Sequence, residues 1–157
     1  MAKLKFTFRT LTHSPERLNV ISAKLGTTER EGFKTGTDVG KPMAMGTIPG
    51  TFAIAAAGAE VEGFLDNVDA GGTQDGFDFG GVACGNRGLR YHAEIEGAAN
   101  LFDLVVAGDN ATAGEANASG LGKVKVGEPK LHIWRIIDIA GGADTATGGE
   151  TVTLELL

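Results

Sequence analysis

The stretch Thr151-Val-Thr-Leu-Glu-Leu-Leu157 decides the fold of this 157-residue chain. It alternates polar and apolar residues, so Val152, Leu154 and Leu156 share one face of an extended strand. Successive side chains of a β-strand point to opposite sides, and a period of two therefore indicates a strand with one buried face. The other strong patterns of the chain have the same period. The sequence predicts a mainly β protein in which this segment belongs to a sheet.

Working outward from this segment, most of the chain divides into short β-patterned runs. Glycine accounts for 25 residues, more than double the usual share of about 7%, and supplies turns between the runs. We expect a compact β-sandwich or a partly open β-barrel. The predicted strands are Lys3–Leu11, Thr51–Ala57, Glu60–Leu65, Phe77–Cys84, Leu89–Ile95, Leu101–Val106, Val124–Val126 and Leu131–Ala140.

The first 41 residues are patterned differently from the rest. Residues 18–25 fit a strand. They also fit a short helix that begins before them, with Ser14 as its N-cap and Pro15 as its first helical residue. Residues 26–41 are polar and rich in glycine, which indicates a long loop or an extended arm. We therefore expect an N-terminal strand and extended arm over residues 1–41 and an all-β domain over residues 42–157.

Charge is unevenly distributed along the chain. Residues 1–45 hold 8 basic and 4 acidic residues, whereas the remainder holds 6 basic and 16 acidic residues. Such asymmetry steers association with a charged partner or between copies, and it also fits two differently solvated faces of one fold. An acidic body repels phosphate groups, and no aromatic residues alternate with the basic ones. Nucleic acid is therefore not an expected partner.

The sequence offers little catalytic chemistry. His13 and Ser14 are adjacent on a predicted turn with no orienting acid, and His92 and His132 fit solvated or boundary positions. The acidic segment 66–78 is the best metal candidate, because Ca²⁺ prefers carboxylate and carbonyl oxygens, but its spacing fails the EF-hand pattern. We expect a solvated loop there. No catalytic residue, cofactor or metal site is assigned, and the protein is not expected to be an enzyme.

Targeting and redox signals are few. Cys84 is the single cysteine, so no internal disulfide is possible. The first residues lack an apolar stretch of signal-peptide length, and no run is long enough to span a membrane. We therefore expect a soluble protein made in a cytoplasm, with no membrane partner. The glycosylation sequons at Asn110 and Asn117 carry no weight without a secretion signal.

Trp134 is the single tryptophan and lies in the apolar run Leu131-His-Ile-Trp-Arg-Ile-Ile-Asp-Ile139. A large aromatic side chain in a buried run is most simply a core anchor. A single tryptophan also serves as the energetic centre of some protein interfaces, so a role at a subunit interface stays open.

Several segments from Gly40 onward resemble the small head-decoration, or capsid cement, proteins of tailed bacteriophages. The similarity covers about three-quarters of the chain and is carried by short motifs. These are Val39-Gly-Lys-Pro-Met-Ala-Met-Gly46, Ala57-Gly-Ala-Glu-Val-Glu-Gly-Phe-Leu65, Val105-Val-Ala-Gly-Asp-Asn-Ala111, and Ile136-Ile-Asp-Ile-Ala-Gly-Gly-Ala-Asp144 followed by the closing strand.

The resemblance implies a non-enzymatic virion protein, made in the bacterial host and located on the outer capsid surface. Such proteins commonly form homotrimers that clamp neighbouring major capsid subunits against the pressure of internal DNA. We expect the N-terminal segment to contact the capsid or a neighbouring copy, with Phe6, Phe8, Arg9 and Arg17 as contributors. The alternatives are a phage tail or baseplate β-module and a small ligand- or Ca²⁺-binding β-barrel.

Overall fold

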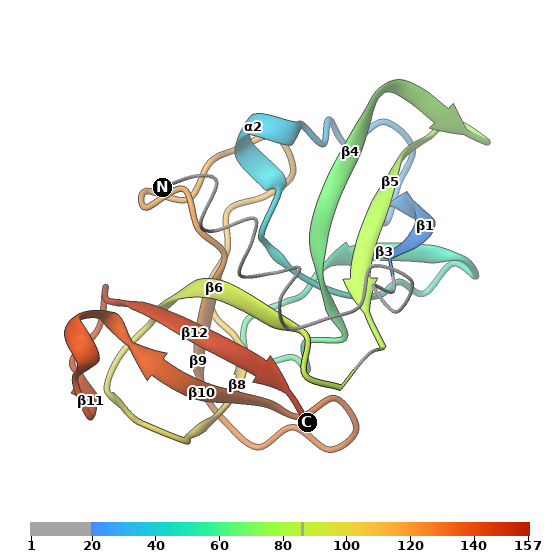
Figure 1. Ribbon diagram of the computed structural model, residues 1–157. Helices are drawn as coiled ribbons and strands as arrows, with labels where there is room; N and C mark the ends of the chain where they lie inside the picture. The colour runs from blue at the N-terminus through green and yellow to red at the C-terminus, as the bar shows by residue number, and fades with distance from the viewer. Residues whose placement is uncertain (1–19, 86) are drawn as a thin grey trace.

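The structure is a computed structural model that describes residues 20–85 and 87–157 (Figure 1). It is mainly β and contains two five-strand sheets, each of which closes on itself as a small barrel. The predicted fold class is confirmed, with the difference that the chain forms two barrels in place of one. A short helix, α2 (Thr35–Asp38), lies above the first barrel (Figure 1).

The first barrel has the strand order β1-β3-β2-β4-β5, and β5 returns to pair with β1. Its neighbouring strands are antiparallel except for β1 and β3, which run parallel and pair at two positions. The strands are β1 (Val20–Leu25), β2 (Pro42–Met45), β3 (Thr51–Ile54), β4 (Gly63–Gln74) and β5 (Phe77–Cys84).

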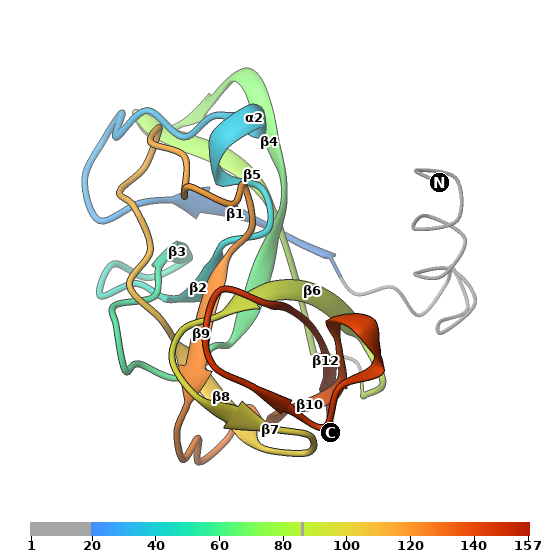
Figure 2. The ribbon, with the colours of Figure 1, turned by 90° about the vertical axis from the view of Figure 1, so that its left-hand side faces the viewer.

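The second barrel has the order β10-β12-β6-β9-β8, closed by the pairing of β8 with β10. Figure 2 looks along it, with β6, β9, β8, β10 and β12 around the opening of the ribbon. Its strands are β6 (Arg90–Ile95), β8 (Leu104–Ala107), β9 (Lys123–Val126), β10 (Trp134–Ile139) and β12 (Thr151–Leu156). Outside the barrel are a two-stranded sheet of β7 (Ala99–Asn100) and β11 (Thr145–Ala146) and a 3₁₀ turn over Ala140–Gly142.

The terminal segment takes the place that its pattern predicts. Strand β12 lies between β10 and β6, and its apolar residues Val152, Leu154 and Leu156 are 1%, 0% and 6% exposed. Thr153, on the opposite face, is also buried, and its hydroxyl lies 3.2 Å from Nδ1 of His92. The segment is therefore an interior wall of the second barrel.

A shared core joins the two barrels. The larger cluster of buried residues contains Phe64 and Ala83 of the first barrel together with Trp134, Ile136 and Leu154 of the second. A smaller cluster, which includes Leu25, Met43 and Val82, fills the first barrel. The barrels therefore pack against each other through apolar side chains, and this burial is the main favourable contribution to their association.

The prediction of a solvated loop in the acidic segment 66–78 is wrong. Strand β4 continues to Gln74 and pairs with β5, and Asp75-Gly76 forms the two-residue turn between them. Both turn residues have positive φ, 53° for Asp75 and 81° for Gly76, as the common hairpin turn with this sequence requires. The glycine and acidic content of the segment hides a strand whose pairing is interrupted between Val68 and Thr73.

The predicted arm also differs from the structure where the two can be compared. Residues 20–25 form strand β1 of the first barrel, the strand of the two alternatives that the sequence leaves open. Of residues 26–41, Phe33, Asp38 and Lys41 are buried. The first barrel therefore includes residues 20–41, and the part of the predicted arm that precedes Val20 lies outside the described residues.

Candidate functional site: the junction of the barrels and its surroundings

The residues that the sequence assigns to contacts are placed very differently. Phe6, Phe8, Arg9 and Arg17 lie outside the described residues. Trp134 is 0% exposed and lies at the junction of the barrels. Full burial fits the role of Trp134 as a core anchor. Its role at a subunit interface stays a prediction.

Aromatic packing surrounds Trp134. Its ring meets the ring of Phe64 edge-to-face, with 4.9 Å between centroids and an interplanar angle of 88°. Phe64 in turn stacks on Tyr91 at 4.9 Å. The indole Nε1–H donates a hydrogen bond of 3.0 Å to the carbonyl oxygen of Val61, which satisfies the polar atom of this buried side chain. The first barrel supplies Phe64 and the second supplies Tyr91 and Trp134.

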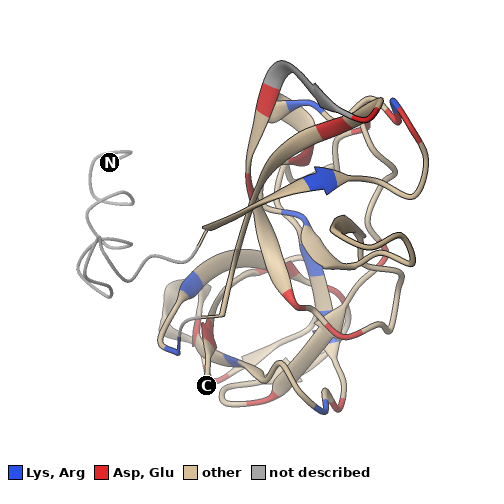
Figure 3. Ribbon diagram, turned by 90° about the vertical axis from the view of Figure 1, so that its right-hand side faces the viewer, with Lys and Arg blue, Asp and Glu red and all other residues tan. Residues whose placement is uncertain are grey.

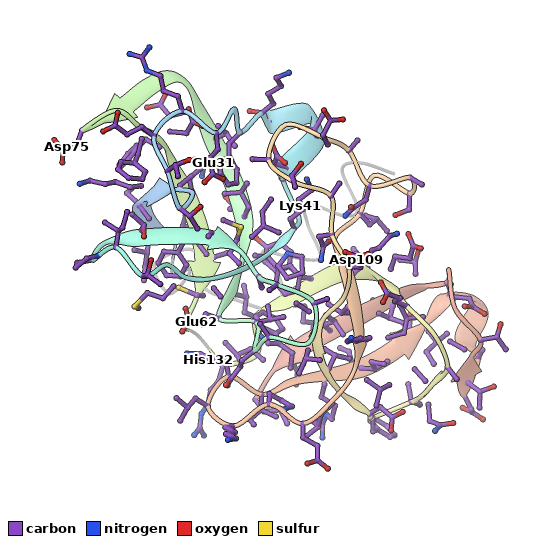
Figure 4. All side chains as sticks on the ribbon, turned by 180° about the vertical axis from the view of Figure 1, so that it is seen from behind. Glu31, Lys41, Glu62, Asp75, Asp109 and His132 are labelled. Atoms are coloured by element: carbon purple, nitrogen blue, oxygen red, sulfur yellow. The ribbon has the colours of Figure 1, made fainter. Side chains whose placement is uncertain are left out.

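A buried ion pair forms a second contact between the barrels. Lys41 and Asp38 are 1% and 0% exposed, and the Lys41 Nζ lies 2.7 Å from Asp38 Oδ1. The ammonium also donates to the carbonyl oxygens of Ala111, Thr112 and Glu115, at 3.0, 3.1 and 2.6 Å. Figure 4 shows Lys41 below α2, within the body of the protein. Lys41 therefore holds the β8–β9 loop of the second barrel against the first.

Asp38 completes this arrangement from its other side. Its carboxylate accepts hydrogen bonds from the backbone N–H of Lys34 at 2.7 Å and of Gly114 at 2.9 Å, and from the Thr37 hydroxyl at 3.1 Å. Each charge of the pair is therefore met by several hydrogen bonds, which buried charges require. We name the set Asp38, Lys41 and residues 111–115 the inter-barrel clamp.

The β8–β9 loop is held in shape by two asparagines. Asn117 is 6% exposed, accepts a hydrogen bond from the Ala111 N–H and donates to Asn110 Oδ1 and to the Leu121 carbonyl. Asn110 accepts a hydrogen bond from the Lys123 N–H, and its side-chain amide donates to the carbonyl oxygens of Gly108 and Lys123. The two sequons therefore contain asparagines that organise the loop, a role that the sequence motif does not indicate.

The backbones of the two barrels come close together at Gly40 and Gly122. A Cβ on Gly122 would lie 2.1 Å from the Gly40 carbonyl oxygen and 2.9 Å from Pro42 Cδ, so no larger residue fits without moving the backbone. We expect Gly122→Ala to lower the free energy of unfolding by about 1–3 kcal/mol in urea titration, the usual cost of overpacking. The control is Gly36→Ala in α2, because a Cβ added at Gly36 would have no contact within 4 Å. Equal stability of the two variants would contradict this close contact.

A cleft of about 270 Å³ lies beside the junction. It is lined by Thr27 and Glu31, by residues 53–57 and by residues 109–113. Glu31 Oε1 accepts hydrogen bonds from the backbone N–H groups of Thr27 and Thr28, at 2.6 and 2.9 Å, and from both hydroxyls. The carboxylate is thereby committed to the loop that carries it, and its role is to hold the wall of the cleft.

The pKa of Glu31 sets a pH dependence for this loop. Burial raises the pKa of the carboxyl, but the hydrogen bonds from Thr27 and Thr28 outweigh burial and bring the pKa below its ordinary value. A lowered pKa contributes stability above the ordinary value of about 4.3, and this contribution is lost as the pH falls through the folded-state pKa. We therefore expect Glu31→Gln to destabilise the protein at neutral pH and to have little effect at pH values well below the folded-state pKa of Glu31.

Urea unfolding of Glu31→Gln and of the wild type across the acid range measures this effect, with the exposed Glu128→Gln as control. A destabilisation by Glu31→Gln that stays constant to the acid limit would contradict it.

The histidines of the described segments lie apart from one another. His132 Nδ1 lies 3.5 Å from Glu60, and His92 lies beside Thr153 on the second barrel. Within residues 20–85 and 87–157, no group of three or more His, Cys, Asp or Glu residues is placed to hold a metal ion. Asp75, in the acidic segment 66–78, pairs with Lys24 Nζ at 2.6 Å.

Exposed apolar side chains are found on both barrels. Ile21, Met45 and Ile48 belong to the first barrel, at 41%, 65% and 37% exposure. Phe102 is 60% exposed and lies under Arg135, whose guanidinium is 5.6 Å from the ring centroid. Leu131 reaches 81% exposure in the loop before β10. These side chains are candidates for contacts with a partner or with another part of the chain.

Basic and acidic residues are both distributed along the ribbon of the described residues (Figure 3). Residues 20–157 contain 10 basic and 19 acidic residues, a net charge of −9, whereas residues 1–19 contain 4 basic and 1 acidic residue, a net charge of +3. Among the described residues, no helix is both long and apolar enough to cross a membrane. Neither a protein-family model nor a curated protein matches the chain.

Proposed function

We propose that this protein is a structural virion protein that decorates the outer surface of a phage capsid and stabilises it by clamping neighbouring major capsid subunits. The resemblance of residues 40–157 to head-decoration proteins carries the proposal. A small, mainly β body is compatible with it. The protein acts by contact, as a homotrimer, and needs no cofactor.

The charge distribution supports a two-part design. The −9 body is joined to a +3 segment that contains the alternating run Lys3–Leu11. Opposite net charges on two parts of a chain favour contact between one molecule and its neighbours, and they increase the rate at which the molecules associate. In this proposal the N-terminal segment contacts the capsid or a neighbouring copy through Phe6, Phe8, Arg9 and Arg17, and the acidic body faces outward.

A repetitive surface strengthens such contacts. A capsid presents the same site many times, so a trimer that engages several sites at once gains from multivalency even when each contact is weak. The inter-barrel clamp and the shared aromatic core hold the two barrels together, which lets a force applied to one barrel be carried by the other. This is the mechanical property that a clamp between capsid subunits needs.

Removal of residues 2–12 tests the role of the N-terminal segment. We expect the truncated protein to keep its folded body and to lose binding to undecorated heads, measured by co-sedimentation beside the full chain. The melting temperature and circular dichroism spectrum of the truncated protein serve as the folding control. Unimpaired binding of the folded truncation would exclude this segment as the attachment site.

A further inference from the structure

Arg135 of β10 carries a charge that no described residue neutralises. It lies opposite Glu155 of β12, but the Glu155 carboxylate pairs with Arg90 of β6 instead, at 2.8 Å. Among residues 20–85 and 87–157, no acidic side chain forms an ion pair with Arg135, and its Nε–H is buried without a hydrogen-bond partner. The side chain as a whole is only partly buried. Its terminal guanidinium N–H groups are therefore available to a carboxylate of another molecule, which their planar geometry suits.

The ring of Phe102 is held beside this guanidinium in a strained backbone conformation. Residues 100–103 form a β-turn, closed by a hydrogen bond of 3.1 Å from the Asp103 N–H to the Asn100 carbonyl. Phe102 is the third residue of the turn and has a φ of 72°, at a position that favours glycine or asparagine. Because the ring is 60% exposed, core packing does not explain this choice of residue. Backbone strain of this kind is concentrated at binding and active sites. We name Phe102 and Arg135 the basic surface.

The first barrel exposes a pair of side chains with complementary chemistry. Met45, at the end of β2, is 65% exposed. The Glu62 carboxylate lies beside it, because it accepts a hydrogen bond from the Met45 N–H. Glu62 forms no ion pair with any residue that the structure describes. A methionine thioether packs favourably on an aromatic ring. We name Met45 and Glu62 the acidic surface.

The two surfaces belong to different parts of the molecule. Strand β10 lies in the second barrel, whereas β2 and β3 lie in the first, and the two views show these strands well apart (Figures 1 and 2). One molecule therefore cannot join its own basic and acidic surfaces. Two copies can join them, since each copy offers both.

We propose that the basic surface of one copy binds the acidic surface of a second copy, and that this contact is repeated around the homotrimer. The Arg135 guanidinium pairs with the Glu62 carboxylate. The Phe102 ring packs against the Met45 thioether. A contact between two different surfaces closes into a ring when the rotation between copies fits, and a ring of three repeats it three times. The inference rests on the homotrimer of the proposed function and names the side chains that hold it together.

The overall charge explains why such a local pair is needed. Residues 20–157 contain 10 basic and 19 acidic residues, a net charge of −9, so the bodies of two copies repel each other. A basic group that meets an acidic group across the contact opposes this repulsion and fixes which surfaces associate. Arg135 is suited to this part because its charge is not already paired within its own barrel.

Charge reversal tests the pairing by sedimentation equilibrium of the full chain. We expect Arg135→Glu and Glu62→Arg each to raise the concentration at which half of the protein is trimeric by at least about tenfold, the effect of losing a central contact. The double variant restores opposite charges at every contact and has the net charge of the wild type, so it should associate as the wild type does. The exposed Lys130→Glu and Glu128→Arg are the controls for net charge and should change association little.

Circular dichroism shows that each variant is folded. A wild type that stays monomeric, or single variants that associate as the wild type does, would overturn the inference. Single variants that dissociate without recovery in the double variant would overturn the pairing of Arg135 with Glu62. Head binding is a separate readout: trimers that depend on this pairing but do not bind heads would support the inference and contradict the capsid role.

The Phe102→Gly variant tests the ring without changing any charge. Glycine adopts a φ of 72° without strain, so the turn is expected to keep its shape. We expect this variant to keep the wild-type circular dichroism spectrum and to need at least about tenfold more protein for half-maximal association. Phe102→Tyr keeps the ring and should associate as the wild type does. Equal association of the glycine variant and the wild type would contradict a contact through Phe102.

Discussion

Replacement of Lys41 by methionine is expected to destabilise the protein by about 3–5 kcal/mol, the cost of leaving one member of a buried ion pair without its partner. In the wild type, the Lys41 ammonium meets Asp38 and three backbone carbonyls. Methionine fills a similar volume but offers no donor to any of them. The Asp38 carboxylate would stay buried with an uncompensated charge, and the β8–β9 loop would lose its attachment to the first barrel.

Urea titration monitored by circular dichroism measures this effect. The matched control is Lys24→Met, because Lys24 pairs with the exposed Asp75 and exposed pairs contribute about 0–1 kcal/mol. The double variant Asp38→Asn with Lys41→Met should recover part of the loss, since it removes both charges. A Lys41→Met variant as stable as Lys24→Met would show that the inter-barrel clamp contributes little to stability.

Replacement of Trp134 by alanine is the second substitution expected to lower the free energy of unfolding strongly. Trp134 is fully buried, packs on Phe64 across the junction and donates to the Val61 carbonyl. Truncation of a buried tryptophan leaves a cavity and an unpaired carbonyl, and its cost is about 3–5 kcal/mol. We expect the loss to be greatest in the contact between the barrels, because the cavity opens beside the stacked rings of Phe64 and Tyr91.

The melting temperature and the m-value in urea measure the effect of Trp134→Ala. Phe102→Ala removes a ring that is 60% exposed and serves as the control, with little expected loss. A Trp134→Phe variant separates the two contributions, because it keeps much of the aromatic volume and loses the indole N–H. Stability of Trp134→Ala within about 1 kcal/mol of the wild type would contradict the central place of this residue in the core.

The second barrel is where sequence and structure agree best. Its strands alternate clearly, as in Leu89–Ile95 and Thr151–Leu157, and a strand with one buried face leaves that pattern in the sequence. Trp134 in its apolar run likewise indicates a core position. These features depend on local pattern alone, which is why the sequence is enough to predict them.

The first barrel shows what local pattern cannot provide. The turn Asp75-Gly76 is a hairpin signal, but the glycine-rich residues around it lack the apolar alternation that marks a strand. Lys41 and Asp38 lie in a polar stretch of the sequence, which predicts that both charges are exposed to solvent. Their burial depends on residues 111–115, about seventy positions further on, whose carbonyls meet Lys41 only in the folded chain. No spacing within residues 26–41 indicates such a partner.

Binding to heads is the measurement that tests the central proposal most directly. Purified full-length protein is mixed with expanded, undecorated heads of the phage that encodes it, and the pellet is quantified after sedimentation. The capsid role predicts saturable binding at a fixed ratio to the major capsid protein, and light scattering of the free protein should give the mass of a trimer. The absence of saturable binding, with free protein that forms rings or tubes, would contradict the decoration role and favour a tail or baseplate module.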